Sequence, residues 1–339
     1  MKKRIIACML TGIMTKGMLA GCGGSSGNAA GSGEGAADAG SGYNMTLIMS
    51  QRDEFLSSLE SASNAAAKEN GVALTVQDAQ NDMSKQIQFL ESAKNAGHQA
   101  CIVNVVDSDS AQEVVNAAGD MKIVFVNRAP SDISVLNENA VCVTSDETQA
   151  GGLQAEYLAN YFKEQGKTEI KYILLEGIEG HVSTTLRTQS VLEGLAAAGI
   201  TATEATAPLA AKYDRAVAMD KISPLLGTVE FDCIISNNDS MALGAIEAME
   251  AKGMDPSSIP IVGVDATADG RRAIAEGKLA MSAYQNPIGQ GEGATKAAIN
   301  LLEGNPINQG TDFEFSEESE YRVNVPFEMV TIDNVADYD

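Results

Sequence analysis

Residues 101–107 read Cys-Ile-Val-Asn-Val-Val-Asp, a short β-rich run with Asn104 inside it and Asp107 directly after it. Similar runs alternate with amphipathic helical stretches from Asn44 almost to the C-terminus. This alternation is typical of βαβ units on a parallel sheet and predicts an α/β fold. The predicted strands cover residues 46–50, 73–77, 101–106, 123–127, 141–144, 172–176, 231–236, 261–264 and 279–284.

Glycine marks the ends of several predicted helices. Gly71, Gly97, Gly199 and Gly253 each follow an apolar-periodic run, where a left-handed C-cap is expected. The folded part of the chain spans roughly 300 residues, which is more than one ordinary core serves. Two domains or one large α/β unit are therefore expected.

Polar side chains follow nearly every predicted strand. Parallel α/β sheets bind ligands at the carboxyl ends of their strands, so these side chains form a candidate site. The set comprises Asp53 and Phe55, residues 78–82, Asn104 and Asp107, Asn127 and Arg128, residues 177–181, Ser183 and Arg187, residues 237–239, Asp265, and Gln285 with Asn286. Polyols need this mixture of carboxylate acceptors, guanidinium donors and amides that do both. An aromatic ring adds a surface for the apolar side of a sugar.

Each of these residues also has a purely structural interpretation. Asp53, Asp239 and Asp265 precede predicted helices and are candidates for N-caps. Phe55 is of a type more often found in a core than in a binding site, and His181 is more often a hydrogen-bonded loop residue than a ligand. The set as a whole nevertheless favours a polyol site.

The N-terminus has the features of an export signal. A basic start at residues 2–4 precedes an apolar run over 5–14, and Leu19-Ala20-Gly21-Cys22 follows it. This pattern predicts a bacterial lipoprotein signal peptide over residues 1–21, with cleavage before Cys22 and lipidation of its thiol. The run is too short for a membrane-spanning helix. We expect an extracytoplasmic protein anchored by lipid to the bacterial cell membrane, at the cell surface or in the periplasm.

Residues 22–42 are predicted to be a linker. All residues from 23 to 42 except Asn28, Glu34 and Asp38 are Gly, Ser or Ala, so nothing there forms a core.

The amino-acid composition limits which classes of partner the protein is expected to bind. The chain has 46 acidic and 23 basic residues, a net charge of −23, which repels nucleic acid and anionic lipid surfaces. His98 and His181 are the only histidines, so we predict no metal and no cofactor. Cys101, Cys142 and Cys233 each lie in an apolar predicted strand, which indicates packing and not a disulfide framework.

Five motifs, in order, carry a family resemblance. Residues 78–86, 102–107, Gly180-His181 with Arg187, 237–245 and 263–265 resemble the periplasmic glucose/galactose-binding proteins, and ribose-binding relatives share many of these motifs. The resemblance extends from Thr46 to the C-terminus. It implies two Rossmann-like parallel-sheet lobes joined by a three-segment hinge, the type I periplasmic binding protein fold. Such a monomer closes over one sugar and presents it to an ABC permease.

The resemblance also implies roles for residues. Asp53 and Asn104 would bind hydroxyls from the first lobe with Phe55 stacking on the ring, and Arg187, Asn238 and Asp265 would bind from the second lobe with His181 at the ring end. Tyr213 stands where the family has a tryptophan, Gln285 where the hexose branch has asparagine, and Ser183 where it has aspartate. Arg128 either contacts ligand or braces the closed form. The change at Ser183 leaves the identity of the sugar open. The family's calcium loop would lie between Phe162 and Tyr172, where the segment is short and lacks alternating oxygen ligands, so no calcium is expected.

The resemblance places the lobe boundaries as well. The first lobe would combine residues 43–128 and 287–320, and the second 129–286 and 321–339. The hinges would lie near 127–130, 285–287 and 320–325.

We therefore predict a lipid-anchored solute-binding protein, not an enzyme, that delivers a monosaccharide, a hexose such as galactose or glucose, to an ABC permease. A pentose or inositol ligand and a chemosensory sugar receptor remain alternatives. An exported carbohydrate-active enzyme is less favoured, because the sequence contains no Gly-x-Ser-x-Gly or His-Glu-x-x-His motif. A sugar-responsive repressor would need a basic DNA-binding headpiece.

Overall fold

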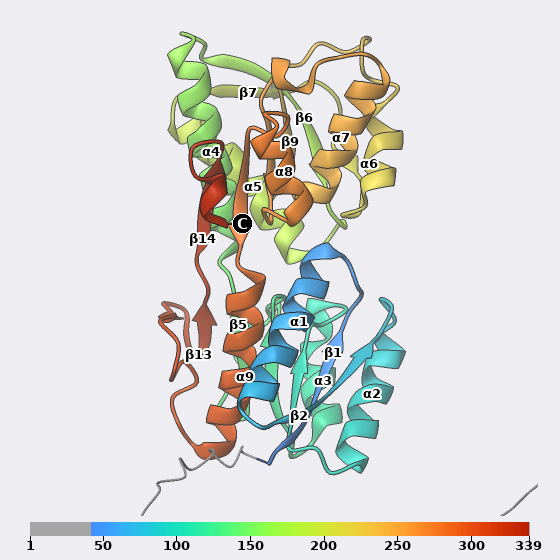
Figure 1. The fold of residues 1–339 in the computed structure, drawn as a ribbon, viewed down its shortest axis with the longest axis vertical. Helices are drawn as coiled ribbons and strands as arrows, with labels where there is room; N and C mark the ends of the chain where they lie inside the picture. The colour runs from blue at the N-terminus through green and yellow to red at the C-terminus, as the bar shows by residue number, and fades with distance from the viewer. Residues whose placement is uncertain (1–41, 339) are drawn as a thin grey trace, which may run out of the picture. The chain divides into compact units, whose positions relative to one another are not determined.

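A computed structural model of the chain describes residues 42–338 (Figure 1). The predicted signal peptide, Cys22 and all of the predicted linker except Gly42 lie outside the described residues. Between residues 42 and 338, no helix combines the length and the apolar character needed to cross a membrane.

The first of two sheets has seven strands in the order β12-β13-β5-β4-β3-β1-β2. Strands β1 to β5 are parallel to one another, β13 joins β5 in parallel, and β12 pairs antiparallel at the edge. The strands are β1 (Asn44–Met49), β2 (Ala73–Asp78), β3 (Ala100–Val103), β4 (Lys122–Val126), β5 (Ala140–Thr144), β12 (Glu314–Ser316) and β13 (Ser319–Asn324).

The second sheet has the order β14-β11-β10-β9-β6-β7, with the short β8 also paired to β6. Its strands are parallel except β14, which pairs antiparallel with β11. The strands are β6 (Glu169–Glu176), β7 (Thr201–Glu204), β8 (Leu209–Ala210), β9 (Cys233–Ser236), β10 (Ile261–Val264), β11 (Met281–Gln285) and β14 (Phe327–Thr331).

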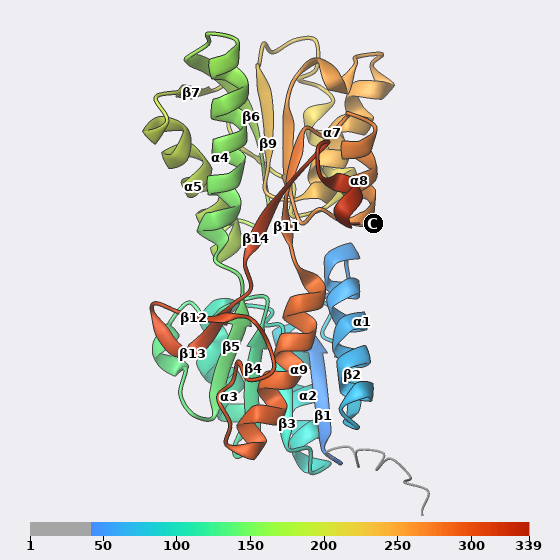
Figure 2. The same cartoon turned by 60° about the vertical axis from the view of Figure 1, so that its left-hand side comes forward.

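Helices cover both faces of each sheet, as Figure 2 shows for α9 on β4 and β5. The first sheet packs α1 (Glu54–Glu69) and α9 (Pro287–Glu303) on one face and α2 (Met83–Asn95) and α3 (Ala111–Ala118) on the other. The second packs α4 (Glu147–Glu164) and α5 (Val182–Ala197) on one face, and α6 (Arg215–Ile222), α7 (Asp239–Ala251) and α8 (Ala268–Ala275) on the other. Each sheet with its helices forms one α/β lobe. The predicted fold class is thus confirmed.

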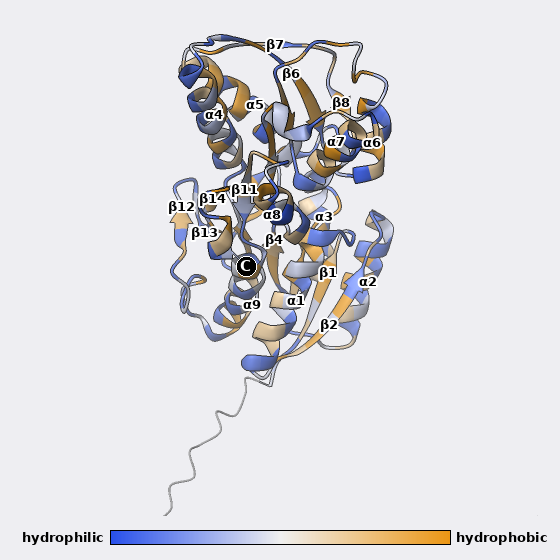
Figure 3. Ribbon diagram, turned by 45° about the horizontal axis from the view of Figure 1, so that its top comes forward, coloured by the Kyte–Doolittle hydropathy of each residue, from blue (hydrophilic) through white to orange (hydrophobic). Residues whose placement is uncertain are grey.

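Successive side chains along each strand point to opposite faces of the sheet, so each core has two layers. Ala100 and Ile102 pack toward α1 and α9, whereas Cys101 and Val103 pack toward α2 and α3. The apolar colouring of the strands in Figure 3 shows why both faces need helical cover. Cys101, Cys142 and Cys233 are buried free thiols, as predicted.

Residues with known capping preferences mark the ends of the helices. Asp53, Asp82 and Asp146 cap the first turns of α1, α2 and α4 by accepting hydrogen bonds from backbone N–H groups. The four glycines predicted to end helices, at positions 71, 97, 199 and 253, all have φ between 65° and 79°. Only glycine adopts this left-handed conformation without strain.

The chain passes between the lobes three times, and two predicted boundaries need correction. β5 was expected in the second lobe, but it pairs with β4 in the first sheet, so the first passage lies at residues 145–146 and not at 127–130. The turn and proline at 127–130 lead only to the next strand of the same sheet. β13 also belongs to the first sheet, which moves the third passage to residues 325–326. The second passage, at Asn286 between β11 and α9, falls within the predicted segment.

The sequence prediction also missed five strands, namely β7, β8, β12, β13 and β14. β7 and β12 are largely exposed edge strands, so they lack the apolar runs by which the other strands were found.

Candidate ligand-binding cleft

The carboxyl ends of the strands of both lobes line a cleft, and its inner pocket has a volume of about 50 Å³. Of the residues that the family resemblance places at the ligand, all except Asn104 line this pocket, whereas residues 78–82, Asp107, Asp239 and Asn286 of the wider candidate set do not. The lining residues are Gln51, Asp53, Phe55, Leu56, Asn127, Arg128, His181, Ser183, Arg187, Tyr213, Asn238, Asp265 and Gln285.

A larger outer cavity of about 620 Å³ adjoins the inner pocket. The two share Asn127, Arg128, His181 and Ser183, so they are parts of one cleft. The outer cavity is bounded by the 127–133 turn, the first passage with the first turn of α4 (145–148), the start of α5, and β13 with the turn before it.

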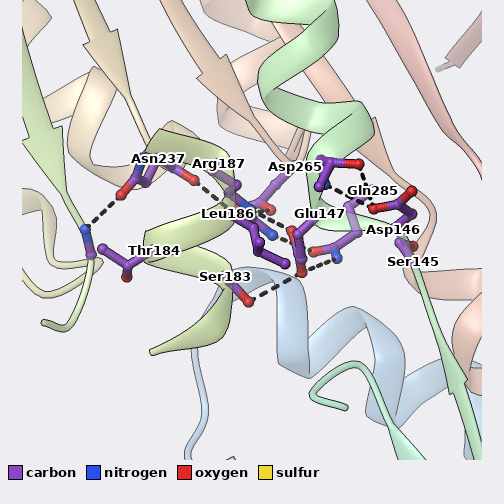
Figure 4. A network of polar contacts seen from close by, with 12 residues as sticks. Ser145, Asp146, Glu147, Ser183, Thr184, Leu186, Arg187, Asn237, Asp265 and Gln285 are labelled. Atoms are coloured by element: carbon purple, nitrogen blue, oxygen red, sulfur yellow. Dashed lines mark hydrogen bonds and ion pairs between the residues drawn. The ribbon is translucent and has the colours of Figure 1, made fainter. Parts of the chain in front are cut away.

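Arg187 is the centre of the polar network in the second lobe (Figure 4). Its Nε donates to Glu147 Oε2 at 2.6 Å, its Nη1 to the carbonyl of Asn237 at 2.7 Å, and its Nη2 to Gln285 Oε1 at 3.3 Å. Burial alone would lower the pKa of Arg187, but the carboxylates of Glu147 and Asp265 together raise it. The guanidinium is therefore charged and fixed before any ligand arrives.

Glu147 is a member of this network that the sequence did not indicate. It is the first residue of α4, directly after the first passage, and its carboxylate accepts from Ser183 Oγ at 3.1 Å as well as from Arg187. A glutamate in the first turn of a helix normally faces solvent and complements the helix dipole. No local pattern distinguishes this buried one.

Asp265 lies on a strained turn after β10. Its φ is 107° and that of Ala266 is 45°, values that non-glycine residues rarely adopt. The turn brings the Asp265 carboxylate to 3.9 Å from Arg187 Nη1, and burial raises the pKa of Asp265 well above its usual range although Arg187 opposes this. Asp265 is therefore no N-cap, because α8 is capped by Thr267.

A buried carboxylate behind the turn holds it in place. Asp239 Oδ2 accepts from the Thr267 N–H at 2.9 Å, and its Oδ1 accepts from Ser282 Oγ at 2.6 Å. Ser282 Oγ in turn accepts from the Ala266 N–H at 2.9 Å. Burial raises the pKa of Asp239 to about 7, against the effect of these hydrogen bonds. Asp239 therefore supports the strained turn and is not the N-cap of α7, a role that Asn238 fills.

His181 and Tyr213 form the aromatic side of the pocket in the second lobe, with ring centroids 6.4 Å apart. Burial, followed by the nearby Arg128 charge, lowers the pKa of His181 to about 4, so its imidazole is neutral near pH 7. The Tyr213 hydroxyl hydrogen-bonds Thr184 at 2.7 Å. Its ring fills the space where a side chain at Gly177 would lie, which explains why a glycine directly follows β6.

In the first lobe, Asp53 and Phe55 combine structural and cleft-lining roles. Asp53 Oδ1 accepts from the Leu56 N–H at 2.8 Å and so caps α1, while the residue still lines the pocket. Phe55 belongs to the core of the first lobe and is 8% exposed, with that exposure toward the pocket it lines. The structural interpretation is therefore confirmed for both residues, and their place in the pocket lining leaves ligand binding as a prediction.

Asn104 lies behind the cleft wall and not in it. Its Oδ1 accepts from the N–H and Oγ of Ser50, and its Nδ2 donates to the carbonyl of Val126 and to Asn127 Oδ1. These four hydrogen bonds use the full capacity of the amide. Asn127, which has a φ of 65°, lines both parts of the cleft, whereas Asn104 lines neither.

Arg128 is anchored to its own lobe while it lines both parts of the cleft. Its Nη1 donates to the carbonyls of Val105 and Val106 at 3.0 and 3.3 Å. Burial lowers the pKa of Arg128, and Tyr213, Asp53 and Glu147 oppose that effect. These neighbours come from both lobes, so the guanidinium lies at the centre of the cleft.

The cleft thus offers carboxylates, guanidinium groups, amides and the three aromatic rings of Phe55, His181 and Tyr213. Within residues 42–338, no cluster of three or more His, Cys, Asp or Glu side chains is arranged to hold a metal ion. The fold and the cleft define a two-lobed protein whose cleft is suited to a small polar molecule, held by hydrogen bonds and ring contacts.

Comparison with known families agrees with that class. The periplasmic binding protein domain family matches residues 46–306, and the chain belongs to this family. A protein of Rhizobium meliloti named for rhizopine binding is 33% identical over 272 residues, which are 79% of this chain and 83% of that protein. The D-galactose/methyl-galactoside binding periplasmic protein of Haemophilus influenzae is 31% identical, covering 84% of this chain and 88% of that protein.

A solved structure also matches this chain over most of its length. The ABC transporter solute binding protein from Bacillus halodurans with bound myo-inositol matches with a TM-score of 0.73 and 29% identity. The match covers 89% of this chain and 99% of that chain.

Proposed function

We propose that this protein captures a monosaccharide or cyclitol outside the cytoplasm and presents it to an ABC permease. The observation that carries the proposal is the joint lining of the inner pocket, where Asp53, Phe55 and Arg128 of the first lobe face Arg187 and Asp265 of the second. A ligand that contacts both lobes stabilises a closed form, and a permease that recognises this form receives only the loaded protein.

The chemistry of the pocket supports a polyhydroxylated ligand. Arg187 donates, Asp53 and Asp265 accept, and Asn238 and Gln285 do both, which matches hydroxyl groups that each donate and accept. Phe55 and Tyr213 provide apolar surfaces for the ring. Galactose and glucose remain our first candidates, as the resemblance of the motifs implies. The relatives named above add myo-inositol and rhizopine to the candidates.

We further propose that the protein is attached to the cell membrane through a lipid on Cys22 and acts as a monomer. The sequence of residues 1–22 supports the anchor. Radiolabelled palmitate should be incorporated into the wild-type chain in a bacterial host and not into Cys22→Ala. Equal incorporation in both would overturn the anchor without affecting the binding function.

The test of binding is a thermal-shift panel on the purified full-length chain. Galactose, glucose, xylose, ribose, arabinose, myo-inositol and a nucleoside are each added at about 1 mM. A ligand of micromolar affinity should add about 4 kcal/mol to the free energy of unfolding and raise the Tm by several degrees. A response to one hexose supports the first candidates, and a response to a pentose or to inositol transfers the specificity. No shift with any of these compounds or with their derivatives would overturn the proposal.

A further inference from the structure

Gln51 lines the inner pocket, although it is not among the residues that the sequence patterns or the family resemblance assign to the ligand. It lies two residues after the end of β1, and its side chain is half-buried. It therefore stands at the carboxyl end of a strand in a largely parallel sheet, where such sheets bind ligands.

The orientation of the Gln51 amide is fixed by its two partners. Its Nε2 donates to Asp53 Oδ2 at 3.1 Å, and its Oε1 accepts from Asn81 Nδ2. A carboxylate only accepts hydrogen bonds, so the nitrogen of the amide must face Asp53. Asp53 Oδ1 is used by the α1 cap, which leaves Oδ2, directly beside Gln51 Nε2, as the oxygen available to a ligand.

Asn81 belongs to residues 78–82, a motif of the candidate set that does not line the pocket. Its backbone N–H donates to the carbonyl of Ser50 at 2.6 Å, so the turn after β2 is bonded to the turn after β1. Its φ of 56° is left-handed, a conformation that asparagine adopts more readily than most residues. The motif therefore reaches the pocket through Gln51 and not directly.

Gln51 and Asp53 together keep hydrogen-bonding capacity for a ligand. An amide nitrogen can donate two hydrogen bonds and an amide oxygen can accept two, and within residues 42–338 Gln51 uses one of each. An N–H donor and a carboxylate acceptor thus lie side by side, 3.1 Å apart, at the edge of the pocket. Two hydroxyls on neighbouring ring carbons match this pair, because one can donate to the carboxylate while the other accepts from the amide.

We propose that Gln51 is a ligand-binding residue, and that Gln51 and Asp53 together select rings with two adjacent hydroxyls on the side facing the first lobe. Asn81 is the positioning residue of this pair, because it holds the Gln51 oxygen and so leaves one N–H of Nε2 for the ligand. This inference rests on the proposed function, because it concerns the ligand of the same pocket.

The test is isothermal titration calorimetry on the full-length chain. The probes are the compound that gives the largest shift in the thermal-shift panel and its monodeoxy analogues, one for each hydroxyl. The wild type should bind the analogue that lacks the hydroxyl at Gln51 about fivefold more weakly than the parent compound. Gln51→Leu should bind the parent about fivefold more weakly than the wild type does, and should bind that analogue as well as the parent, because the hydrogen bond is already lost.

Asp53→Asn shows whether the two residues bind different hydroxyls. It should lose discrimination against the analogue that lacks the hydroxyl on the adjacent carbon, and keep discrimination at the carbon assigned to Gln51. The Tm of each variant without ligand, within a few degrees of the wild type, shows that the variant is folded.

Asn81→Asp tests the positioning role without changing Gln51. A carboxylate at position 81 repels the Gln51 oxygen, so the amide must leave its orientation between Asn81 and Asp53. Affinity for the parent should fall about fivefold, with the same loss of discrimination as in Gln51→Leu. The matched control is Gln80→Glu, which adds the same charge one residue earlier, at a side chain that bonds Lys85 outside both linings, and should bind as the wild type does.

The outcomes separate this inference from the proposed function. If the parent compound binds and Gln51→Leu discriminates against every analogue as the wild type does, Gln51 is not a ligand contact and the binding function stands. If Gln51→Leu and Asp53→Asn lose discrimination only at the same hydroxyl, the selection of adjacent hydroxyls is refuted. Equal binding by Asn81→Asp and Gln80→Glu refutes the positioning role of Asn81. If the wild type binds neither the panel compounds nor their analogues, the proposed function itself fails.

Discussion

The two lobes contribute to the cleft in different ways. In the second lobe, Arg187, Glu147 and Gln285 form one buried hydrogen-bonded network, and Asp265 is held on a strained turn by Asp239. In the first lobe, Asp53 accepts from the Leu56 N–H and from Gln51 Nε2, and Arg128 donates to backbone carbonyls, so the two groups are held separately and not in one network. The second lobe is therefore organised before ligand binds, and the first supplies a surface that completes the site.

This difference predicts which lobe contributes more of the binding free energy. Groups that are already fixed lose little entropy when they bind, so they contribute more affinity than groups ordered on binding. We expect substitutions in the second lobe to reduce affinity most, and substitutions in the first lobe to affect closure.

Arg187→Ala should have the largest effect. It removes a buried cation and leaves Glu147 and Asp265 without their partner, which in comparable buried pairs costs about 2–5 kcal/mol. We expect a loss of sugar affinity of about 100-fold or more by calorimetry. Circular dichroism at the same temperature checks that the variant is folded.

The control for Arg187→Ala is Arg272→Ala. The neighbouring Arg271 is unsuitable as a control, because its Nη1 donates to the carbonyl of Ala266 in the strained turn at 2.8 Å. The side chain of Arg272 is 67% exposed. Binding by Arg187→Ala equal to that of Arg272→Ala would remove Arg187 from the site.

Asp265→Asn and Asp53→Asn compare one carboxylate from each lobe directly. Asparagine preserves the α1 cap at position 53, since it is as good an N-cap as aspartate. We expect affinity to fall about 30-fold for Asp265→Asn, whose carboxylate is buried and prepositioned, and about fivefold for Asp53→Asn. A larger loss at Asp53 than at Asp265 would reverse the proposed order of the lobes.

Asp239→Asn tests whether Asp239 supports the turn that carries Asp265, through the pH dependence of the free energy of unfolding. Burial raises the pKa of Asp239 from 3.8 to about 7, so between these values the folded state holds a proton that the unfolded chain has lost. The contribution of this group to the free energy of unfolding therefore decreases as pH rises from about 4 to 7. Asparagine does not titrate, so the stability advantage of the wild type should be larger at pH 5 than at pH 8.

Denaturant unfolding of both proteins at the two pH values measures this difference. Sugar affinity of Asp239→Asn should fall about threefold, because the turn that carries Asp265 is less well held. An advantage of the wild type that is the same at pH 5 and pH 8 would show that the buried carboxyl is ionised in the folded protein across this range.

The fold, and the placement of most candidate binding residues along the cleft, followed from sequence because local chemistry determines them. Apolar runs locate the buried strands, and polar residues directly after them reach the cleft by topology alone. Glu147 escaped prediction and Asp239 was assigned the wrong role, because the roles of both depend on partners far along the chain, such as Arg187 and Ser282. The first boundary was misplaced for a similar reason, since only strand pairing assigns β5 to a sheet.

Glu54→Ala should have the smallest effect and addresses the contact between lobes. Glu54 Oε1 accepts from the Asp269 N–H at 3.3 Å, joining the first turn of α1 in the first lobe to the first turn of α8 in the second. This bond is long and lies at the rim, so its loss should change affinity less than about twofold. It should instead shift the unliganded protein toward the open form. Small-angle scattering should show a larger radius of gyration without sugar and an unchanged one with sugar, whereas Glu69→Ala, exposed in the last turn of the same helix, should match the wild type in both states. An affinity loss as large as that of Asp53→Asn would mean that the first lobe contributes binding energy through its rim, and the difference between the lobes would then be one of position and not of preorganisation.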